Sequence, residues 1–196
     1  MSIEEICKKY GIKNYTINDD GSIDVGGDVY LQAYHIKELP LTFNKVTGSF
    51  NCSRNSLTTL KGSPKSVGGR FDCGYNHILP DLKGSPDSVG GSFDCDGNNL
   101  TSLEGSPESV GGHFNCQFNN LTDLKGSPKS IGGGFYCSNN PIGSIFNDAD
   151  IDFIRAFNTF KVLNDGIVNL KRLKYVMEMF DLPIHLEDIK KYYTIK

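Results

Sequence analysis

The fold is decided by residues 110–121, which read Val-Gly-Gly-His-Phe-Asn-Cys-Gln-Phe-Asn-Asn-Leu. The same Val-Gly-Gly-x-Phe-x-Cys-x-x-Asn frame, in stronger or weaker form, surrounds five cysteines: Cys52, Cys73, Cys95, Cys116 and Cys137. These cysteines follow one another at steps of 21, 22, 21 and 21 residues. A fixed period in this range indicates a solenoid, in which each copy forms one coil. The long step has its extra residue within 78–82, where the sibling copies read Leu-Thr-x-Leu.

Within one coil, the order of residues predicts a short strand and two returns of the chain to the core. Phe71 and Cys73 alternate with polar residues, so both should face inward from a strand that ends at Asn76. Ile78 and Leu82 should then turn inward again. Stacked about 4.8 Å apart, the strands would form a parallel sheet over a buried column of Phe, Cys, Leu and Val. We expect the inward Asn amides to bond backbone groups of adjacent coils, since buried polar groups need partners.

We count six coils in a solenoid over residues 25–146, and a small α/β cap at each end. The coils open at Val25, Val46, Val67, Val89, Val110 and Ile131. In the N-terminal cap, residues 1–24, Ser2 and Glu5 form a capping box that predicts a helix over 3–10. The sequence Asn-Asp-Asp-Gly at 18–21 predicts a hairpin between 15–17 and 22–25.

The C-terminal cap, residues 147–196, lacks the repeat. Helical spacing predicts a helix over 148–159, with Asn147 or Asp148 as its N-cap and Ile151, Ile154, Phe157 and Phe160 inward. The sequence Asn-Asp-Gly at 164–166 predicts a second hairpin, and Asn169 can cap a helix over 170–180. Residues 186–193 should form a last short helix or strand. The apolar face of this cap should cover the open end of the solenoid.

The segment from Leu100 to Leu121 resembles the leucine-rich repeat, Leu-x-x-Leu-x-Leu-x-x-Asn-x-Leu. Its short period and its Leu-Thr-x-Leu run are similar to the short bacterial subclass, and the Gly-Ser-Pro-x-Ser-Val-Gly-Gly-x-Phe-x-Cys form is similar to repeat proteins of tailed bacteriophages. The resemblance covers residues 22–146. It implies a leucine-rich-repeat solenoid with its parallel sheet on the concave face, and a phage-encoded factor acting in the bacterial cytoplasm.

Composition argues against several classes of function. The formal charge of −3 argues against a large nucleic-acid-binding field. The chain has no run of 18 apolar residues, and its first residues do not resemble a signal peptide. We therefore expect no membrane span and a cytoplasmic location, where thiols stay reduced.

The residues also argue against catalysis and metal binding. No two cysteines of the repeat lie closer than one coil, so parallel stacked thiols would not converge on a metal ion. The four histidines lie in no nucleophile motif: His35, His77, His113 and His185. The glycine pairs match no phosphate-binding loop. We expect no enzymatic activity, no metal, no cofactor and no small-molecule ligand.

The concave face is then the candidate site. Its outward positions vary between coils while the inward positions scarcely do, and exposed aromatics beside arginines favour contact with a protein. The candidate binding residues are Asp28, Tyr30, Asn51, Arg54, Arg70, Asp72, Tyr75, Asp94, Asp96, His113, Asn115, Gln117, Phe118, Tyr136 and Asn139.

The leading interpretation is a non-enzymatic protein-binding module that inhibits or modulates a host or defence protein. One alternative is a structural protein that self-associates or attaches to a virion through its caps. Another is mimicry of nucleic acid by the acidic strip of Asp72, Asp94 and Asp96. Binding by such a mimic would weaken steeply with salt.

Overall fold

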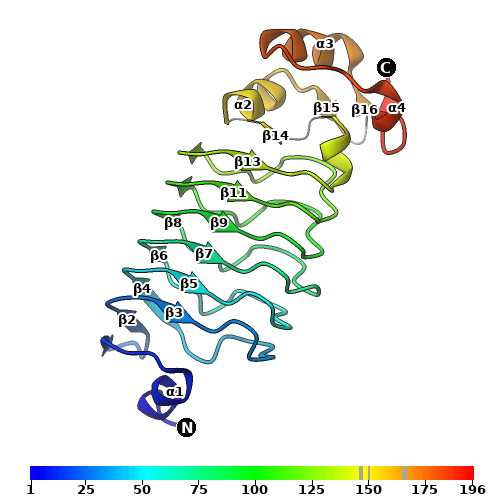
Figure 1. The fold of residues 1–196 in the computed structure, drawn as a ribbon. Coiled ribbons are helices and arrows are strands. Elements are labelled where there is room, and N and C mark those ends of the chain that lie inside the picture. The colour runs from blue at the N-terminus through cyan, green and yellow to red at the C-terminus, as the bar shows by residue number, and fades with distance from the viewer. Residues whose placement is uncertain (146–147, 150, 165–166) are drawn as a thin grey trace.

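The computed structural model describes residues 1–145, 148–149, 151–164 and 167–196 and contains a parallel β-solenoid of about five turns (Figure 1). Every coil contributes one strand to each of two sheets. The first sheet contains β2 (Ile23–Val25), β4 (Phe43–Val46), β6 (Ser66–Val67), β8 (Ser88–Val89), β10 (Ser109–Val110) and β12 (Ser130–Ile131). The second contains β3 (Val29–Tyr30), β5 (Phe50–Asn51), β7 (Phe71–Asp72), β9 (Phe93–Asp94), β11 (Phe114–Asn115) and β13 (Phe135–Tyr136).

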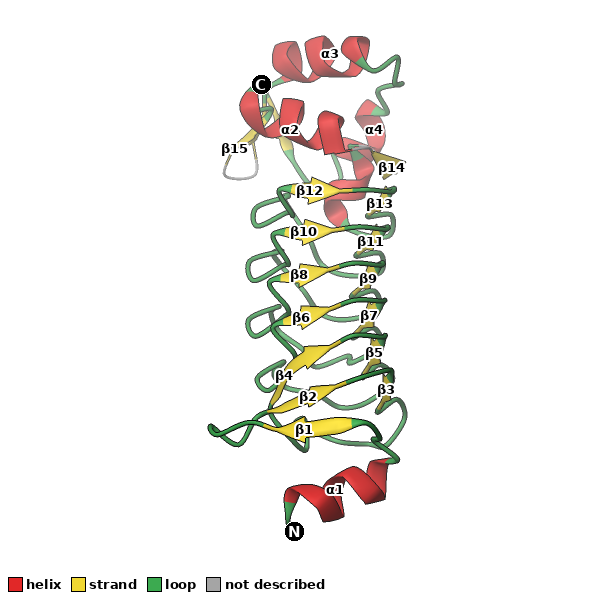
Figure 2. Cartoon of the chain, turned by 90° about the vertical axis from the view of Figure 1, so that its left-hand side faces the viewer, coloured by secondary structure: helices red, strands yellow, loops and turns green. Residues whose placement is uncertain are grey.

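The first of these sheets was missed from the sequence, which predicted one strand per coil. The Ser-Val dipeptide before each glycine pair is itself a strand, and Val67 pairs with Val89 and Val89 with Val110. Two residues are too few to show an alternation of apolar and polar side chains, so the pattern gave no sign of it. Figure 2 shows the two sheets side by side as nearly straight stacks.

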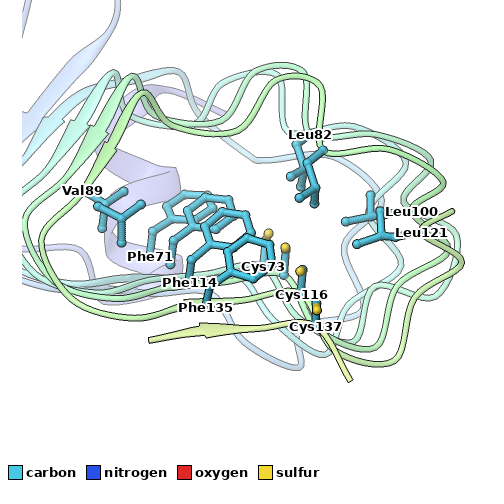
Figure 3. Close-up of a cluster of buried hydrophobic side chains, with 14 of the residues drawn as sticks. Phe71, Cys73, Leu82, Val89, Leu100, Phe114, Cys116, Leu121, Phe135 and Cys137 are labelled. Atoms are coloured by element: carbon cyan, nitrogen blue, oxygen red, sulfur yellow. The ribbon is translucent and has the colours of Figure 1, made fainter. Parts of the chain in front are cut away.

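Phenylalanine rings fill the core between the sheets. The rings of Phe50, Phe71, Phe93, Phe114 and Phe135 stack with centroids 5.3 to 5.6 Å apart and planes within 6° to 9° of parallel. The repeat cysteines and the leucine pairs of the four middle coils lie beside them, fully buried (Figure 3). The predicted column of Phe, Cys, Leu and Val is confirmed.

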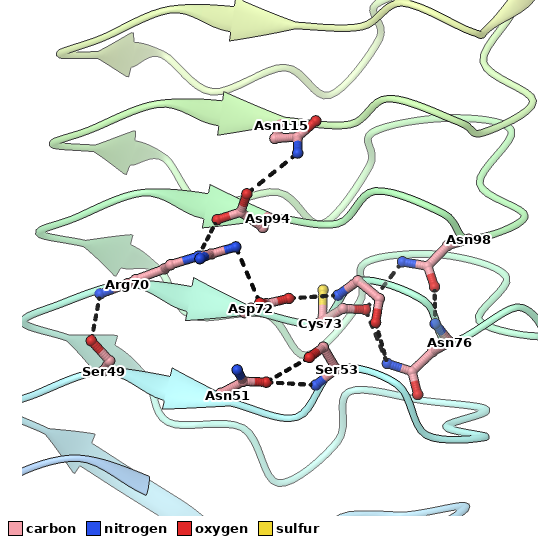
Figure 4. Close-up of polar contacts among 11 residues, drawn as sticks. Ser49, Asn51, Ser53, Arg70, Asp72, Cys73, Asn76, Asp94, Asn98 and Asn115 are labelled. Carbon is pink, nitrogen blue, oxygen red and sulfur yellow. Dashed lines mark hydrogen bonds and ion pairs between the residues drawn. The ribbon is translucent and has the colours of Figure 1, made fainter. Parts of the chain in front are cut away.

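The predicted asparagine ladder is also confirmed. The Asn76 amide donates to the carbonyl oxygens of Cys52 and Cys73 at 3.2 and 3.0 Å, and its Oδ1 accepts from the Leu57 amide at 3.0 Å. Figure 4 shows Asn76 and Asn98 on successive coils, where the backbone amide of Asn76 donates to Asn98 Oδ1 at 2.7 Å. The asparagine side chain thus supplies hydrogen-bond partners for backbone groups at the end of the strand, where the hydrogen bonds between strands stop.

Coil 3 absorbs the extra residue differently from our expectation. Ile78 is 53% exposed, whereas Leu79 is fully buried. A turn in which the Leu79 amide donates to the Asn76 carbonyl places Leu79, with Leu82, in the two leucine positions. The apolar pair of this coil is therefore Leu79 and Leu82, and the insertion leaves Ile78 in solvent.

The N-terminal cap matches the prediction. Helix α1 (Ile3–Tyr10) begins at the Ser2–Glu5 capping box and ends at Gly11 in the left-handed conformation. Strand β1 (Tyr15–Ile17) pairs antiparallel with β2 and closes that end of the first sheet.

The C-terminal cap is confirmed in its main elements. They are β14 (Asp148–Ala149), α2 (Ile151–Thr159), β15 (Leu163–Asn164), β16 (Ile167–Val168), α3 (Leu170–Met179), α4 (Leu186–Ile189) and β17 (Thr194–Ile195). β15 and β16 form the predicted hairpin, and Asn169 caps α3 by accepting from the Arg172 amide. The Tyr193 hydroxyl donates to the Thr122 carbonyl at 2.9 Å and so ties the cap to the solenoid.

Two details of the C-terminal cap differ from the prediction. Asp148 lies in β14, which pairs antiparallel with β13 and closes the second sheet, so the helix begins only at Ile151; Asn147 lies outside the described residues. Phe160 is 37% exposed, and Phe153 is buried in its stead. No helix among the described residues is long and apolar enough to cross a membrane.

A column of glycines allows the coils to stack closely at the corner between the two sheets. A Cβ on Gly68, Gly90, Gly111 or Gly132 would lie closer than 3.0 Å to the backbone carbonyl oxygen of the preceding coil. Neither that oxygen nor the corner can move without breaking the strand spacing on both sides. These glycines are therefore required by close approach of backbone to backbone.

We predict that Gly111→Ala lowers the free energy of unfolding by about 3 kcal/mol, because the methyl group would overlap the Gly90 carbonyl. Urea unfolding followed by circular dichroism measures the change. Gly26→Ala is the matched control: its Cβ would meet nothing closer than 3.4 Å, and we expect a change within about 0.5 kcal/mol. Equal stability of the two variants would contradict the stacking argument.

The buried thiols give a second prediction. Burial raises the pKa of Cys52, Cys73, Cys95 and Cys116 above the ordinary value of 9.0. Above that pH the unfolded chain loses these protons while the folded chain keeps them. The free energy of unfolding should therefore fall above about pH 9, by up to about 1.4 kcal/mol per pH unit for each thiol. Urea titrations at pH 8 and pH 10 measure this fall in the free energy of unfolding. Equal midpoints at the two pH values would show that the cysteine side chains are open to solvent.

Candidate functional site

The candidate residues lie on the outer side of the second sheet and at its edge, a surface we call the β3–β13 face. Because the strands stack in register, equivalent residues of successive coils form rows that run along the solenoid. The face is consequently a long strip instead of a closed pocket (Figure 4).

Most side chains in the row that precedes each phenylalanine accept a hydrogen bond from a backbone amide. Asp28 Oδ1 accepts from the Ser49 amide at 2.7 Å, and Ser49 Oγ accepts from the Arg70 amide at 3.2 Å. Near the other end, His113 Nδ1 accepts from the Gly134 amide at 2.7 Å. Asp28 and His113 therefore have a structural role on this face that the repeat pattern did not reveal.

The row between Phe and Cys has a second structural role. The side-chain oxygens of Asn51, Asp72 and Asn115 each accept from the amide two residues further on, at 3.0, 3.0 and 3.2 Å. This local bond terminates the strand, as Asn and Asp do in Asx turns. Tyr30 and Tyr136 occupy the same row and cannot make this bond, so the role is limited to the three coils that contain Asn51, Asp72 and Asn115.

Charged side chains converge in the middle of the face. Arg70 Nε lies 2.6 Å from Asp94 Oδ2, and an Arg70 terminal nitrogen lies 3.2 Å from Asp72 Oδ2 (Figure 4). Asn115 donates to the other Asp94 oxygen at 3.4 Å. One guanidinium thus links carboxylates from two neighbouring coils.

Two of the carboxylates are disfavoured in their charged form. Burial raises the pKa of Asp72, and the Gly74 amide and Arg70 offset this only in part. Burial also raises the pKa of Asp96, to which the charge of Asp94 adds, while hydrogen bonds and Arg70 act in the opposite direction. Asp96 has no ion pair within 4.0 Å among the described residues, in contrast to its two neighbours.

Two glycines that interrupt the repeat make room for this cluster. A Cβ on Gly74 would lie 2.8 Å from an oxygen of the Asp96 carboxylate, and one on Gly97 would lie 2.9 Å from the ring of Tyr75. Sequence reasoning passed over Gly97 and gave Gly74 no role. The available signal was that siblings of Gly97 are Arg54, Tyr75 and Phe118.

The edge of the face is a row of residues in the left-handed conformation. Arg54, Tyr75, Phe118 and Asn139 have φ of 55°, 56°, 53° and 57°, and Gly97 of the same row has 64°. Tyr75 is 39% exposed and Phe118 is 55% exposed. The Arg54 guanidinium lies 5.2 Å from the centre of the Tyr75 ring, within range of a cation–π contact.

The structure therefore separates the candidate residues into a central group and two terminal pairs. The central patch, as we call it, consists of Arg54, Arg70, Asp72, Tyr75, Asp94, Asp96 and Phe118. At the N-terminal end, the Tyr30 hydroxyl donates to Asp28 at 3.0 Å, and at the other end the rings of His113 and Tyr136 lie 5.4 Å apart. The remaining candidates are Asn51, Asn115, Gln117 and Asn139, and the Gln117 side-chain amide donates to the Ser138 hydroxyl.

In the described part of the chain, no three His, Cys, Asp or Glu side chains are placed to hold a metal ion. The only histidine on the face already accepts a backbone hydrogen bond, and the cysteines beneath it are fully buried. Comparison with protein families, curated proteins and solved structures finds no match to this chain.

We predict that Asp96→Asn stabilises the protein at pH 7. The folded-state pKa of Asp96 lies above its unfolded value, so the charged carboxylate opposes folding at neutral pH and ceases to do so below about pH 4. Since the side chain is partly exposed, we expect a rise of about 1–2 °C in the melting temperature at pH 7 and none at pH 3.5.

Asp20→Asn is the control of opposite sign. Two hydrogen bonds from Ser22 lower the pKa of Asp20, so its charge favours folding above the unfolded pKa and this benefit is lost in acid. This variant should melt lower at pH 7 by calorimetry. A loss of stability in Asp96→Asn at pH 7 would show that the carboxylate is satisfied in the folded protein.

Proposed function

We propose that this chain is a non-enzymatic protein-binding module and that the central patch of the β3–β13 face is its contact surface. The observation that carries the proposal is the exposure of Tyr75 and Phe118 in a left-handed backbone conformation.

Bulky residues are rare in this conformation, which costs them roughly 1 kcal/mol relative to glycine. Gly97 and Asn139 occupy the same row, so the solenoid itself requires no aromatic there. More than half of Phe118 is exposed, and burial in the core cannot account for its presence. A partner that covers the ring would supply the missing stabilisation, since buried aromatics dominate binding hot spots.

The rest of the central patch is held ready for contact. Tyr75 lies between the Arg54 guanidinium and the Gly97 backbone, so its ring loses little freedom on binding. Asp96 has no ion pair within 4.0 Å in the part of the chain that the structure describes, and its pKa is raised by burial. A lysine or arginine of the bound protein would stabilise its charged form.

The same surface favours protein contact over mimicry of nucleic acid. A mimic needs an uninterrupted row of negative charge, whereas Arg70 lies between Asp72 and Asp94 and pairs with both. Arg54 adds a second positive charge at the edge.

Within this proposal, the solenoid is a short leucine-rich-repeat array of six coils, with the first coil opening at Val25. The resemblance of the repeat to bacteriophage proteins supports a phage-encoded factor in the bacterial cytoplasm that inhibits or modulates a host or defence protein. Self-association through the caps is the alternative architecture, and sedimentation at high concentration separates the two: a monomer favours the binding module.

We predict that Phe118→Asn abolishes binding without loss of stability. Asparagine is the natural residue of the row at Asn139 and tolerates the left-handed conformation, so the melting temperature should be unchanged or higher. Capture from a host lysate with the wild-type chain identifies the partner, and titration calorimetry should then show at least about tenfold weaker binding by the variant.

Ile78→Ser serves as the matched control, because Ile78 is similarly exposed but lies in the inserted turn outside the central patch. It should bind as the wild type does. If Phe118→Asn bound its partner with unchanged affinity while Ile78→Ser did not, the contact surface would lie elsewhere on the solenoid.

A further inference from the structure

The C-terminal cap carries a second exposed surface, on the opposite side of α3 from its buried residues. Leu173, Val176 and Met177 of this helix face the core. On the outer side, Tyr175 is 53% exposed and its ring meets that of Phe160 edge to face, with centroids 5.1 Å apart. A pair of aromatic rings in solvent is unusual for the end of a solenoid, which needs a polar outer surface.

Positive charge surrounds this ring pair. The cap patch, as we call it, comprises Phe160, Lys161, Lys171, Arg172, Lys174 and Tyr175. Lys171 and Arg172 lie four and three residues before Tyr175, so both flank its ring on the helix surface. Arg172 donates to the Lys161 carbonyl at 3.3 Å, which brings the end of α2 beside α3.

The four cations of the cap patch form no ion pair with the residues that the structure describes. Among the described residues, none of them has a carboxylate within 4.0 Å, whereas Lys125, Lys129, Lys190 and Lys191 elsewhere each do. Glu178, three residues after Tyr175, is the one acid of the outer side of α3. The local charge is therefore strongly positive in a chain whose formal charge is −3.

We propose that the cap patch binds single-stranded nucleic acid. Unpaired lysine and arginine side chains attract phosphates, and an exposed tyrosine ring offers a platform on which an unpaired base can stack. The Phe160 ring packs edge to face with the Tyr175 ring, and Tyr175 is still 53% exposed, so a base can reach it.

Other anionic partners would contact only part of this combination of cations and an exposed aromatic ring. A membrane surface needs an apolar helix face to insert, and that face of α3 is turned into the core. An acidic protein segment would pair with the cations but leave Tyr175 unused. A base-paired duplex has no free base to stack on the ring.

The test is fluorescence anisotropy of a labelled 12-nucleotide oligothymidylate with the full chain at low salt. We expect micromolar affinity that weakens as salt rises. Tyr175→Ala should weaken binding about tenfold, which is the usual effect of losing one stacked base. Lys171→Gln with Lys174→Gln should lower the slope of log affinity against log salt by about 1.4, since each phosphate contact on a single strand contributes about 0.7.

Matched controls separate this surface from general attraction of anions. Lys61→Gln with Lys65→Gln removes the same charge from exposed loops of the solenoid and should leave affinity unchanged. Tyr30→Ala removes an equally exposed tyrosine at the other end of the molecule and should also have no effect. Against an abasic oligonucleotide of equal length, Tyr175→Ala should bind as the wild type does, because the phosphates remain and the bases are gone.

Several results would overturn the proposal. Absence of binding at low salt would do so, as would equal affinity for polyglutamate, for phosphatidylserine vesicles or for a duplex of the same sequence. Loss of affinity in the Lys61 and Lys65 control equal to that in the Lys171 and Lys174 variant would also do so. Phe118→Asn should bind the oligonucleotide normally, so failure here leaves the proposed role of the central patch untouched.

Discussion

The spacing between neighbouring coils constrains everything else in this structure. Backbone amides of each coil donate to carbonyls of an adjacent coil in both sheets, so the distance between coils is that between paired strands. The corners and returns must keep the same distance, although they carry no regular ladder. Glycine at the corner removes the Cβ that would collide with the previous coil, and asparagine at the strand end supplies the hydrogen bonds that the ladder lacks. The phenylalanine rings stack in parallel at 5.3 to 5.6 Å because they have no other room.

This constraint also decides which surface positions are free. In two rows of the β3–β13 face, side chains such as Ser49 and Asn51 accept hydrogen bonds from backbone amides and so hold the coils in place. In the left-handed row and at the position after the cysteine, the residue type also changes from coil to coil. Tyr75, Asp96 and Phe118 occupy these positions: the two rings are exposed on a left-handed backbone, and burial raises the pKa of Asp96. The proposed contact with another molecule would account for the presence of such residues together.

The two surfaces also show why net charge is a poor guide to partners. Carboxylates lie in the middle of the solenoid and are partly neutralised by Arg70, whereas the four cations of the cap patch form no ion pair with the described residues. The total of −3 describes neither surface. Within roughly one Debye length, about 8 Å at physiological salt, a ligand senses only the charges near its own site.

The amino-acid sequence by itself determined the solenoid, its period, the inward column, the asparagine ladder and the main elements of both caps. Each of these is a local pattern. In the solenoid, repetition of the pattern along the chain makes it recognisable, although one copy alone would be a weak signal. Tertiary structure decided the first sheet, β2 to β12, because its strands are mostly two residues long and exist only through pairing with residues 21 or 22 positions away. It also decided that Leu79 and not Ile78 enters the core, since a turn at Asn76 shifts the register. The grouping of Arg70 with Asp94, and of Phe160 with Tyr175, likewise follows from contacts between coils and between helices that no stretch of sequence contains.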